Sequence, residues 1–577
     1  MFEQLLTIGL FLALIYGLVF TRIAPAWCFS LSMLACYLFG LVGTADVLQK
    51  ASNPGLITLI VLLLVSVGIE KLTWLHDMAG QLIDGAYKKS LLRLGVVTAL
   101  SSAIINNTAV VATLAGTVRS NPHHPASKLL IPLSYMAILG GTMTLIGTST
   151  NLIVSSFLED ATGQGLAFFD FLLVGASAAV LGLLVIVATS KTALPSYEAE
   201  EVTVAEYLIE AEVSANSPLV GKSVIDNKLR DLETLFLVEI VRADHLISPV
   251  SPVEVIEAGD KLIFSGDINQ LQVLDAFEGL KLFAVEEGLL QQNLTEVIVM
   301  PNATVEGKTI KESGFRSLFD AAVVGMHRGG KRLSGKLGEI QLEAGDRLML
   351  ATGPDFGARR NLTKNFFVVQ DLVNTSGISR TENLFISGGL LTVITLATLE
   401  LVPLLKGLAF MLAGMLLLGT IKAEELRRRF PFELWLIIAS ALTWAQVLND
   451  SGLVTVLTDG FHTYLAGLGP YGAIAGIFLL TLALTEIMTN NAAAALSFPL
   501  AFGLAESYGL SHMPFVMAVA YGASASFLTP YGYTTNLMVQ NLAGYEFRDY
   551  VRAGLPVSIV YTVAVIFLIP LVFPFTG

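Results

Sequence analysis

The stretches SSAIINNTA at residues 101–109 and TEIMTNNAA at residues 485–493 decide the fold of this chain. Each places two adjacent asparagines in the middle of an otherwise apolar segment. A second polar segment follows each asparagine pair at a matching distance: GTSTN at 147–151 and GYTTN at 532–536. Paired interruptions at corresponding places in two halves of a chain indicate broken membrane helices around a transport site.

The chemistry of these segments fits that interpretation. Amide and hydroxyl groups are costly to bury in hydrocarbon without partners, so they need a ligand or a neighbouring helix. A broken helix presents carbonyl oxygens at one end, which suit a dehydrated cation such as sodium, and N–H groups at the other end, which suit an anion. The alternative is that these side chains only hold helices together, as Ser, Thr and Asn commonly do in membranes.

Composition places most of the chain in lipid. Of its 577 residues, 54% are hydrophobic and only 14% are charged, whereas soluble proteins average about 25% charged residues. The formal net charge of -13 argues against nucleic acid as a partner. The first apolar run, residues 5–20, has no basic segment before it, so we expect a first membrane helix and not a removed signal peptide.

Charge density divides the chain into three parts. Residues 191–380 hold 28 Asp and Glu and 19 Lys and Arg, more than half of the chain's total. The flanking parts contain apolar runs near residues 4–20, 27–45, 55–70, 92–118, 129–157, 167–190, 384–403, 406–421, 431–448, 471–505, 512–543 and 553–574. A span needs about 20 apolar residues. We therefore predict a polytopic α-helical membrane protein with an N-terminal membrane half at 1–192, two inserted modules at 203–285 and 286–371, and a C-terminal membrane half at 381–577.

The insert contains an internal repeat. GKSV at 221–224 and EAGD at 257–260 recur as GKTI at 307–310 and EAGD at 343–346, with a period of 86 residues. Each EAGD turn lies between apolar runs typical of strands, which predicts two tandem α+β modules. The Gly-Lys-Ser/Thr triplets do not complete a phosphate-binding loop, because Asn216 and Asn302 stand where its first glycine is required. We interpret each triplet as a turn that starts a helix.

Over residues 203–371 this repeated pattern resembles the C-terminal ligand-sensing module of potassium-transport regulators, the RCK-C or TrkA-C type. The resemblance implies a small βαβ-containing domain that dimerises and binds a small cytoplasmic ligand, a nucleotide in some relatives. An insert that only aids dimerisation is the alternative. Lys191 and Arg380 flank the insert and favour a cytoplasmic location under the positive-inside rule.

Both membrane portions, about 390 residues, resemble the divalent anion/sodium symporter family, which includes sodium-coupled sulfate and dicarboxylate carriers. That family carries Ser-Asn-Thr at each of two hairpin tips, where this chain has NNT at 106–108 and NNA at 490–492. The central asparagine is therefore kept twice, the serine is replaced twice, and the threonine is kept once. These departures change which anion fits.

The resemblance implies two sodium sites and one anion site. The sodium ligands would be Ser102, Asn106, Asn107 and Gly147 in the first site and Glu486, Thr489, Asn491 and Gly532 in the second. The anion would lie between the hairpin tips, in contact with Asn106, Asn107, Thr108, Thr148, Asn490, Asn491 and Thr534. Glu486 stands where the family has a neutral hydroxyl residue. An intramembrane carboxylate strengthens a cation site, carries a proton, or only bonds to nearby helix amides.

The implied architecture is a homodimer of inverted repeats, each with a re-entrant hairpin, in which a transport domain slides against a fixed scaffold like an elevator. Neither motif contains Arg or Lys, so the anion would be bound by neutral donors and bound cations. That favours a compact, symmetric anion such as sulfate; a dicarboxylate such as succinate is the alternative, and sodium/proton antiport is a third.

Other functional classes have less support. A membrane enzyme would need a catalytic constellation, and the histidines show no metal-ligand spacing. A gated channel would suit a sensor-like insert but gives no reason for paired broken hairpins. The sequence therefore predicts a multi-pass transporter of the cell membrane, not an enzyme, with sodium as its coupling ion.

Overall fold

The chain folds into two compact units. The computed structural model describes residues 2–21, 23–71, 82–121, 123–197, 208–229, 232, 235–242, 245–247, 250–266, 277–283, 294–300, 303–328, 331–333, 337–353, 356, 359, 362–368, 379–399, 401–456 and 469–576. A helical unit comprises Met1–Ser196, Gly377–Leu537 and Phe547–Gly577, and an inserted unit comprises Tyr197–Ser376 and Met538–Glu546. The predicted module ends at 203, 285, 286 and 371, and Asn302, lie outside the described residues.

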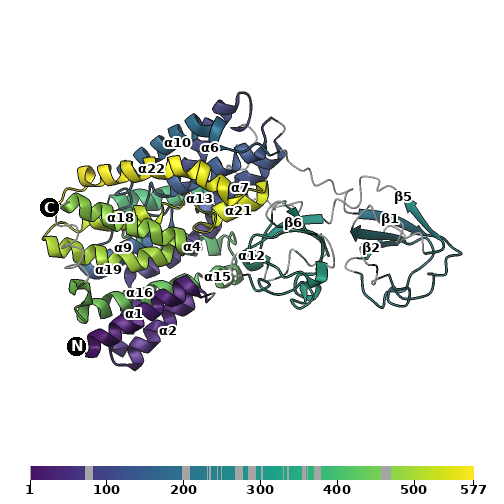
Figure 1. Ribbon diagram of the computed structural model, residues 1–577, viewed down its shortest axis with the longest axis horizontal. Coiled ribbons are helices and arrows are strands. Elements are labelled where there is room, and N and C mark those ends of the chain that lie inside the picture. Colours follow the sequence, from purple (N-terminus) through teal and green to yellow (C-terminus); the bar gives the residue numbers. More distant parts are fainter. Residues whose placement is uncertain are drawn as a thin grey trace. The chain divides into compact units, whose positions relative to one another are not determined.

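The helical unit is built from two sets of helices (Figure 1). The first half of the chain forms α1 (Phe2–Phe20), α2 (Pro25–Leu38), α3 (Thr44–Ala51), α4 (Pro54–Ile69), α6 (Tyr87–Ser102), α7 (Asn107–Ser120), η1 (Ala126–Lys128), α8 (Leu130–Gly141), α9 (Ser149–Thr162) and α10 (Leu172–Ala193). The second half forms α13 (Arg380–Thr398), α14 (Leu404–Leu417), α15 (Ala423–Arg429), α16 (Phe432–Asp450), α18 (Gly469–Ile487), α19 (Asn490–Tyr508), α20 (Met513–Ala523), α21 (Thr534–Ala543) and α22 (Phe547–Val572). Helix α21 begins in this unit and continues past Leu537 into the segment assigned to the inserted unit.

Long apolar helices make this a multi-pass membrane protein. Within the described ranges, seven helical segments are long and apolar enough to cross a bilayer. They are Glu3–Phe20, Thr44–Ile69, Leu172–Ala193, Thr381–Thr398, Phe432–Asp450, Gly469–Ile487 and Phe547–Val572. Shorter apolar helices, including α8 and α20, lie between them in the sequence. The predicted polytopic helical fold is confirmed.

Helices α6–α10 and α18–α22 form two repeats of one arrangement. In the first repeat α6 packs on α7 and α8, and α10 packs on α6 and α8. In the second repeat α18 packs on α19 and α20, and α22 packs on α18 and α20. Every residue of α8 is buried, and so is every residue of α20 except its first. A helix that is apolar on all sides belongs in a protein interior, so α8 and α20 form the centres of the two repeats.

The remaining helices pack chiefly on one another. Helix α2 contacts α1 and α16, α14 contacts α4 and α13, and α3 contacts α16. Their main contacts with the two repeats are made by α4 against α9 and by α16 against α19. The helical unit therefore consists of a repeat-built part and a second group of helices that touches it through α4 and α16.

Glycines allow close helix packing inside each repeat. A Cβ atom on Gly140 of α8 would overlap the backbone of Ala99 on α6. A Cβ atom on Gly522 of α20 would stand 3.0 Å from the carbonyl oxygen of Phe478 on α18. Small residues at such crossings let membrane helices gain van der Waals contact that a hydrophobic driving force cannot supply in lipid.

The inserted unit contains two five-stranded sheets of the same strand order. The first sheet, ordered β3-β2-β4-β1-β5, comprises β1 (Leu208–Val213), β2 (Leu235–Arg242), β3 (His245–Ile247), β4 (Lys261–Gly266) and β5 (Leu280–Phe283). The second, ordered β10-β6-β9-β7-β8, comprises β6 (Leu294–Val299), β7 (Ala321–Arg328), β8 (Lys331–Arg332), β9 (Arg347–Thr352) and β10 (Phe366–Val368). When the second sheet is read from β8 to β10, its strand order matches that of the first sheet. Each strand of the second sheet begins 86 residues after its counterpart in the first. Each sheet has its own hydrophobic core.

One arginine in each module holds the EAGD turn through ion pairs with its two acidic residues. Asp260 accepts two hydrogen bonds of 2.8 Å from Arg242, and its Oδ2 also accepts from Glu257 N. Asp346 has the same arrangement with Arg328 and Glu343 N. The hydrogen bonds that Arg242 donates to Asp260 raise the pKa of its guanidinium above the ordinary value. The repeated carboxylate is therefore a structural clamp on the turn.

Two expectations for the insert differ from the structure. The first Gly-Lys-Ser triplet does not start a helix: residues 221–229 form turns, because Gly221 N donates to Ile256 O and Val224 N donates to Glu254 O. In the second module only the short α11 (Phe315–Phe319) follows the triplet. All strand pairs in the described residues are antiparallel, so the described part contains no parallel βαβ unit. A short α12 (Leu362–Asn365) precedes β10.

Replacing Gly140 by Ala tests the close packing of α6 and α8. We expect Gly140→Ala to destabilise the protein by about 1–3 kcal/mol, because the new methyl group has no room against the α6 backbone. The measurement is the thermal unfolding midpoint of the detergent-purified protein. Gly388→Ala on α13, where the added Cβ meets nothing within 4 Å, is the matched control. An unchanged midpoint for Gly140→Ala would contradict the close approach.

Candidate functional site

Each repeat contains two breaks in its helices. The breaks lie at 103–106 and 142–148 in the first repeat and at 488–489 and 524–533 in the second. A helix that stops inside an apolar unit leaves carbonyl groups at the end of one piece and N–H groups at the start of the next. These groups need partners from the protein or from a ligand.

Two asparagines bridge the longer breaks in the same way. The Nδ2 atom of Asn151 donates to Gly141 O at 3.4 Å and to Thr144 O at 2.8 Å. The Nδ2 atom of Asn536 donates to Ser526 O at 3.1 Å and to Thr529 O at 3.3 Å. Each asparagine thus reaches the carbonyls ten and seven residues before it. The segments GTSTN and GYTTN are therefore equivalent in three dimensions as well as in sequence.

The first hairpin tip brings three predicted residues together. Ser102 Oγ donates to Asn107 Oδ1 at 2.7 Å and also lies 2.8 Å from Ala137 O. Asn107 in turn lies against Gly141, where a Cβ atom would meet its amide. Gly147 lies against the carbonyl of Gly141. The side chains of Ser102 and Asn107 are buried, and the cluster consists entirely of neutral oxygen and nitrogen groups.

The second hairpin tip differs because it carries a carboxylate. Glu486 Oε1 accepts hydrogen bonds from Phe527 N at 3.1 Å and Leu528 N at 3.0 Å. Its Oε2 accepts from Ser526 Oγ at 3.2 Å and Thr529 Oγ1 at 2.7 Å. Gly532 lies against Ser526 and against the carbonyl of Thr485. Glu486, Ser526 and Gly532 therefore form one cluster.

Hydrogen bonds between the repeats join three helix starts, those of α9, α19 and α21. Ser149 Oγ donates to Asn491 Oδ1 at 3.0 Å, which joins the start of α9 to the start of α19. Thr148 Oγ1 lies 3.2 Å from the hydroxyl of Tyr533, the residue before α21. Asn106 caps the start of α7 by accepting from Thr108 N at 2.9 Å. Helix starts carry partial positive charge, so this arrangement suits an anion.

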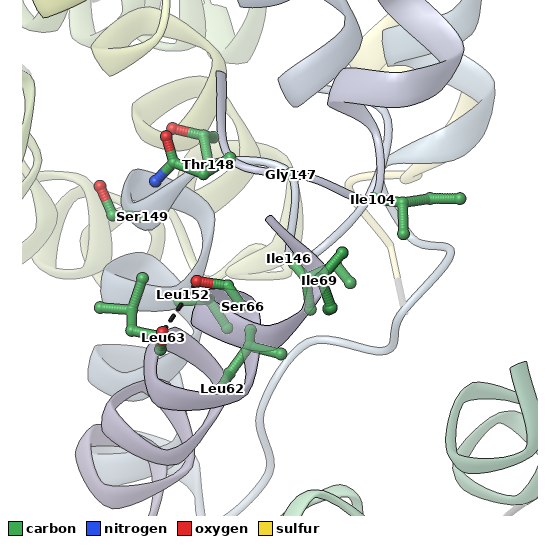
Figure 2. Close-up of a pocket in the computed structure, with 11 residues that line it drawn as sticks. Leu62, Leu63, Ser66, Ile69, Ile104, Ile146, Gly147, Thr148, Ser149 and Leu152 are labelled. Atoms are coloured by element: carbon green, nitrogen blue, oxygen red, sulfur yellow. Dashed lines mark hydrogen bonds between the residues drawn. The ribbon is translucent and has the colours of Figure 1, made fainter. Parts of the chain in front are cut away.

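A cavity lies beside the first hairpin tip. The space between its lining residues is about 380 Å³ when the part open to solvent is included. Its polar lining comprises Asn106, Gly147, Thr148, Ser149 and Ser66, and its apolar lining comprises Leu62, Leu63, Ile69, Ile104, Ile146 and Leu152. Figure 2 shows Leu62, Leu63 and Ser66 of α4 on one side and Thr148 and Ser149 on the other. No charged side chain lines it.

The other predicted residues occupy the rim of these clusters. Asn490 Oδ1 accepts from Asn491 N at 2.9 Å at the start of α19. Thr489 and Thr534 are exposed and, within the described residues, form no side-chain hydrogen bond with another predicted site residue. Thr108 is half-buried in the first turn of α7.

Sequence reasoning missed several residues of this region. Ser149 and Tyr533 lie inside the segments GTSTN and GYTTN, so the motifs contained them but gave no sign of their contacts across the repeats. Ser526 and Thr529 lie in an apolar run with no motif. Ser66 is a single serine in an apolar helix, and its Oγ donates to Leu63 O at 2.8 Å. No sequence signal marked it.

The polar groups of both hairpin clusters are oxygen and nitrogen atoms. The described residues contain no group of three or more His, Cys, Asp or Glu side chains placed to hold a metal ion. Both hairpin clusters offer hydroxyl, amide and carbonyl oxygens, the ligand types that sodium uses at broken helices. Only the second cluster adds a carboxylate.

Comparison with known proteins supports a transporter. The profile of the citrate transporter family, CitMHS, matches residues 14–520. A Chlamydomonas reinhardtii protein provisionally named as a sulfur deprivation response regulator is 31% identical over 90% of this chain and 93% of its own length. The uncharacterized transporter sll0640 of Synechocystis is 28% identical over 92% of this chain and 91% of its own length.

Two further comparisons are more partial or more distant. Sodium/sulfate cotransporter 2 of Chlamydomonas reinhardtii is 29% identical over 61% of this chain and 42% of its own length. Among solved structures, the YdaH transporter of Alcanivorax borkumensis aligns over 99% of this chain and 98% of its own, at 12% identity and a TM-score of 0.46.

Removing either central asparagine should disable the site. We expect Asn107→Ala and Asn491→Ala each to lower transport by roughly tenfold or more, since each loses an amide at a hairpin tip. Asn449→Ala, at the exposed end of α16, is the matched control and should keep the unmodified rate. The measurement is the transport rate of the purified protein in liposomes. The elution profile on size-exclusion chromatography checks that each variant is folded. Unchanged rates in both site variants would remove these residues from the site.

Proposed function

The chain belongs to the citrate transporter family, and from this premise we propose that it is a sodium-coupled symporter of a small divalent anion, most simply sulfate. Its family and relatives are transporters, so its activity is transport across a membrane and not catalysis. The observation that carries the proposal is the meeting of half-helix starts from both repeats beside a cavity without charged lining.

The anion site is proposed at that meeting point. The starts of α7, α9, α19 and α21 contribute partial positive charge, and Asn106, Asn107, Thr108, Thr148, Asn490, Asn491 and Thr534 would supply neutral donors. A dianion bound without Arg or Lys leaves charge to be neutralised. Bound cations are the remaining source of that neutralisation, which ties anion binding to cation binding.

Sodium is proposed at the two hairpin clusters. Ser102, Asn106, Asn107 and Gly147 would form the first site, and Glu486, Thr489, Asn491 and Gly532 the second. The hydrogen bond between Ser102 and Asn107 and the contacts around Gly141 support the first set. The name of the Chlamydomonas sodium/sulfate cotransporter supports this choice of ion and anion.

A carboxylate substrate is the second candidate, because the family profile carries the name citrate transporter. Sulfate is preferred because a tetrahedral ion can be surrounded by short neutral donors. An extended carboxylate would gain from a fixed cationic side chain, and the described cavity lining has none.

We propose that transport moves the repeat-built part against the second group of helices, as in an elevator, within a homodimer. The two groups of helices contact each other mainly through α4 with α9 and through α16 with α19. Such a limited interface supports movement of one group against the other. The inserted unit is proposed to face the cytoplasm and to regulate transport by binding a small ligand, such as a nucleotide, in the manner of RCK-C modules. Its two sheets with separate cores support a self-contained regulatory domain.

Uptake of labelled sulfate into proteoliposomes tests the transport proposal. We expect uptake driven by an inward sodium gradient and only background uptake when choline replaces sodium, because unneutralised anion binding is unfavourable. Excess succinate or citrate should not compete. Sodium-driven uptake of a carboxylate without uptake of sulfate would show that the substrate is a carboxylate. Sodium-driven proton movement without uptake of either anion would show antiport and contradict symport.

Deletion of residues 203–371, with a short Gly-Ser linker, tests the regulatory proposal. We expect the shortened protein to keep sodium-driven uptake, because the helical unit contains the whole proposed site. It should lose any response to adenine nucleotides that the full chain shows on the insert side. The full-length variant Asp346→Ala is a less disruptive test of the insert. It removes only the carboxylate that holds the second EAGD turn. Identical transport by all three proteins under every nucleotide condition would favour an inert insert.

A further inference from the structure

An open apolar cavity lies between helices of the two repeats, away from the hairpin tips. The start of α8 and the end of α10 supply its walls from the first repeat, and the start of α22 supplies the wall from the second. Its lining includes Ile131, Pro132, Ile186, Thr189, Ala193 and Ala553. It shares no residue with the cavity beside the first hairpin tip.

The hydroxyl groups in this lining are already used inside the protein. Tyr135 OH donates to Phe527 O at 2.6 Å, and Thr189 Oγ1 donates to Val185 O at 2.8 Å. The other lining side chains are apolar. The cavity therefore suits hydrocarbon and not a polar solute, because apolar surface gains free energy when hydrocarbon covers it.

One basic residue accompanies each of the three walls. Lys128 ends η1, directly before α8, Lys191 lies in the last turn of α10, and Arg552 lies in the second turn of α22. Each stands within three residues of a residue that lines the cavity. Three positive charges from separate parts of the chain are therefore placed around one apolar opening.

These charges are not neutralised by acids of the described residues. Lys191 and Arg552 are exposed, and Lys128 is half-buried, with its Nζ 5.9 Å from the centre of the Tyr87 ring. The ion pairs of the helical unit that the structure describes, Lys50–Asp160, Lys71–Glu425 and Arg429–Glu70, include none of the three. The corner is thus complementary in charge to an anionic group.

An exposed apolar face continues from Arg552 along α22. It consists of Leu555, Ile559, Val563 and Phe567, which are between 48% and 66% exposed. A spacing of four residues keeps them on one side of the helix. In a bilayer this side meets lipid chains, so α22 presents a cationic residue at the head of a surface for hydrocarbon.

The opposite end of the repeat pair shows that the fold does not require such a corner. There the start of α20 and the end of α22 correspond to the start of α8 and the end of α10. The ring of Phe575 packs against Phe515 and Tyr471, and Ser511 N donates to Phe575 O at 2.9 Å. Residues 509–514 and 573–576 contain no Lys or Arg. An aromatic side chain packs into this second corner, which lacks cationic residues.

We propose that the corner formed by Lys128, Lys191 and Arg552 around the cavity binds an anionic phospholipid of the surrounding bilayer. The phosphate group would contact the three cations, and the acyl chains would lie in the cavity and along the exposed face of α22. Basic pockets between membrane helices are known to bind anionic headgroups. A soluble phosphate could use only the charges, whereas a lipid also covers the apolar surface. Since α10 and α22 belong to different repeats, the bound lipid would connect them at this end.

The test measures lipid binding without transport. The thermal unfolding midpoint of the purified full-length protein is followed in mixed micelles in which phosphatidylglycerol replaces phosphatidylcholine at constant total lipid and salt. We expect phosphatidylglycerol to raise the midpoint, since a ligand that binds only the folded state stabilises it. The triple variant Lys128→Gln/Lys191→Gln/Arg552→Gln should raise the half-maximal phosphatidylglycerol fraction at least roughly tenfold. Lys422→Gln/Arg427→Gln, which removes two exposed charges at α15, is the matched control and should leave it unchanged.

Further variants separate charge, folding and the source of the phosphate. Lys128→Arg/Lys191→Arg/Arg552→Lys keeps the charges and should keep the response to phosphatidylglycerol. Lys191→Gln/Arg552→Gln changes only exposed side chains, so it should weaken the response even if the triple variant folds poorly. Glycerol 3-phosphate, which has no acyl chains, should leave the midpoint of the unmodified protein unchanged.

Three results would overturn the proposal. They are equal stabilisation by the two lipids, a response that survives loss of the charges, and stabilisation by glycerol 3-phosphate as strong as that by phosphatidylglycerol. The last result would indicate a site for a soluble anion. Neither sodium nor sulfate enters the measurement, so its outcome is independent of the proposed transport activity.

Discussion

Backbone groups exposed by broken helices inside an apolar bundle are the constraint on which the rest of this structure depends. Water cannot satisfy them at that depth, so side chains must. Asn151 and Asn536 do so in each repeat by spanning two carbonyls of the preceding break. These hydrogen bonds fix the backbone of the breaks at 142–148 and 524–533, which precede α9 and α21. Part of the cavity lining and two of the contacts between the repeats lie in or beside these loops, at Thr148, Ser149 and Tyr533.

The sequence was sufficient for the helical framework because its signals are strong and local. Apolar runs predict spans, and an asparagine pair in such a run predicts a break. The breaks at 103–106 and 488–489 lie where the asparagine pairs placed them. Contacts between the repeats could not be predicted in this way. The bond from Ser149 to Asn491 joins residues far apart in the chain, and nothing in either segment specifies its partner.

The insert shows where local reasoning fails. A Gly-Lys-Ser triplet after an apolar residue is typical of a turn that begins a helix. In the first module the amides of Gly221 and Val224 instead donate to carbonyl groups in the segment before the EAGD turn. These amides pair with that segment, and no helix begins at the triplet. Glycine was nevertheless informative: Gly221, Gly259, Gly307 and Gly345 all have positive φ, which explains the letter-for-letter recurrence of glycine at these turns.

Helix α4 supplies one wall of the cavity while belonging to neither repeat. Its side chains there, Leu62, Leu63, Ser66 and Ile69, take no part in the hydrogen bonds that hold the two loops open. The shape of the cavity can therefore change on this helix while the two hairpin tips stay intact. Substitutions on α4 can therefore alter the apolar wall of the cavity without removing any of those hydrogen bonds.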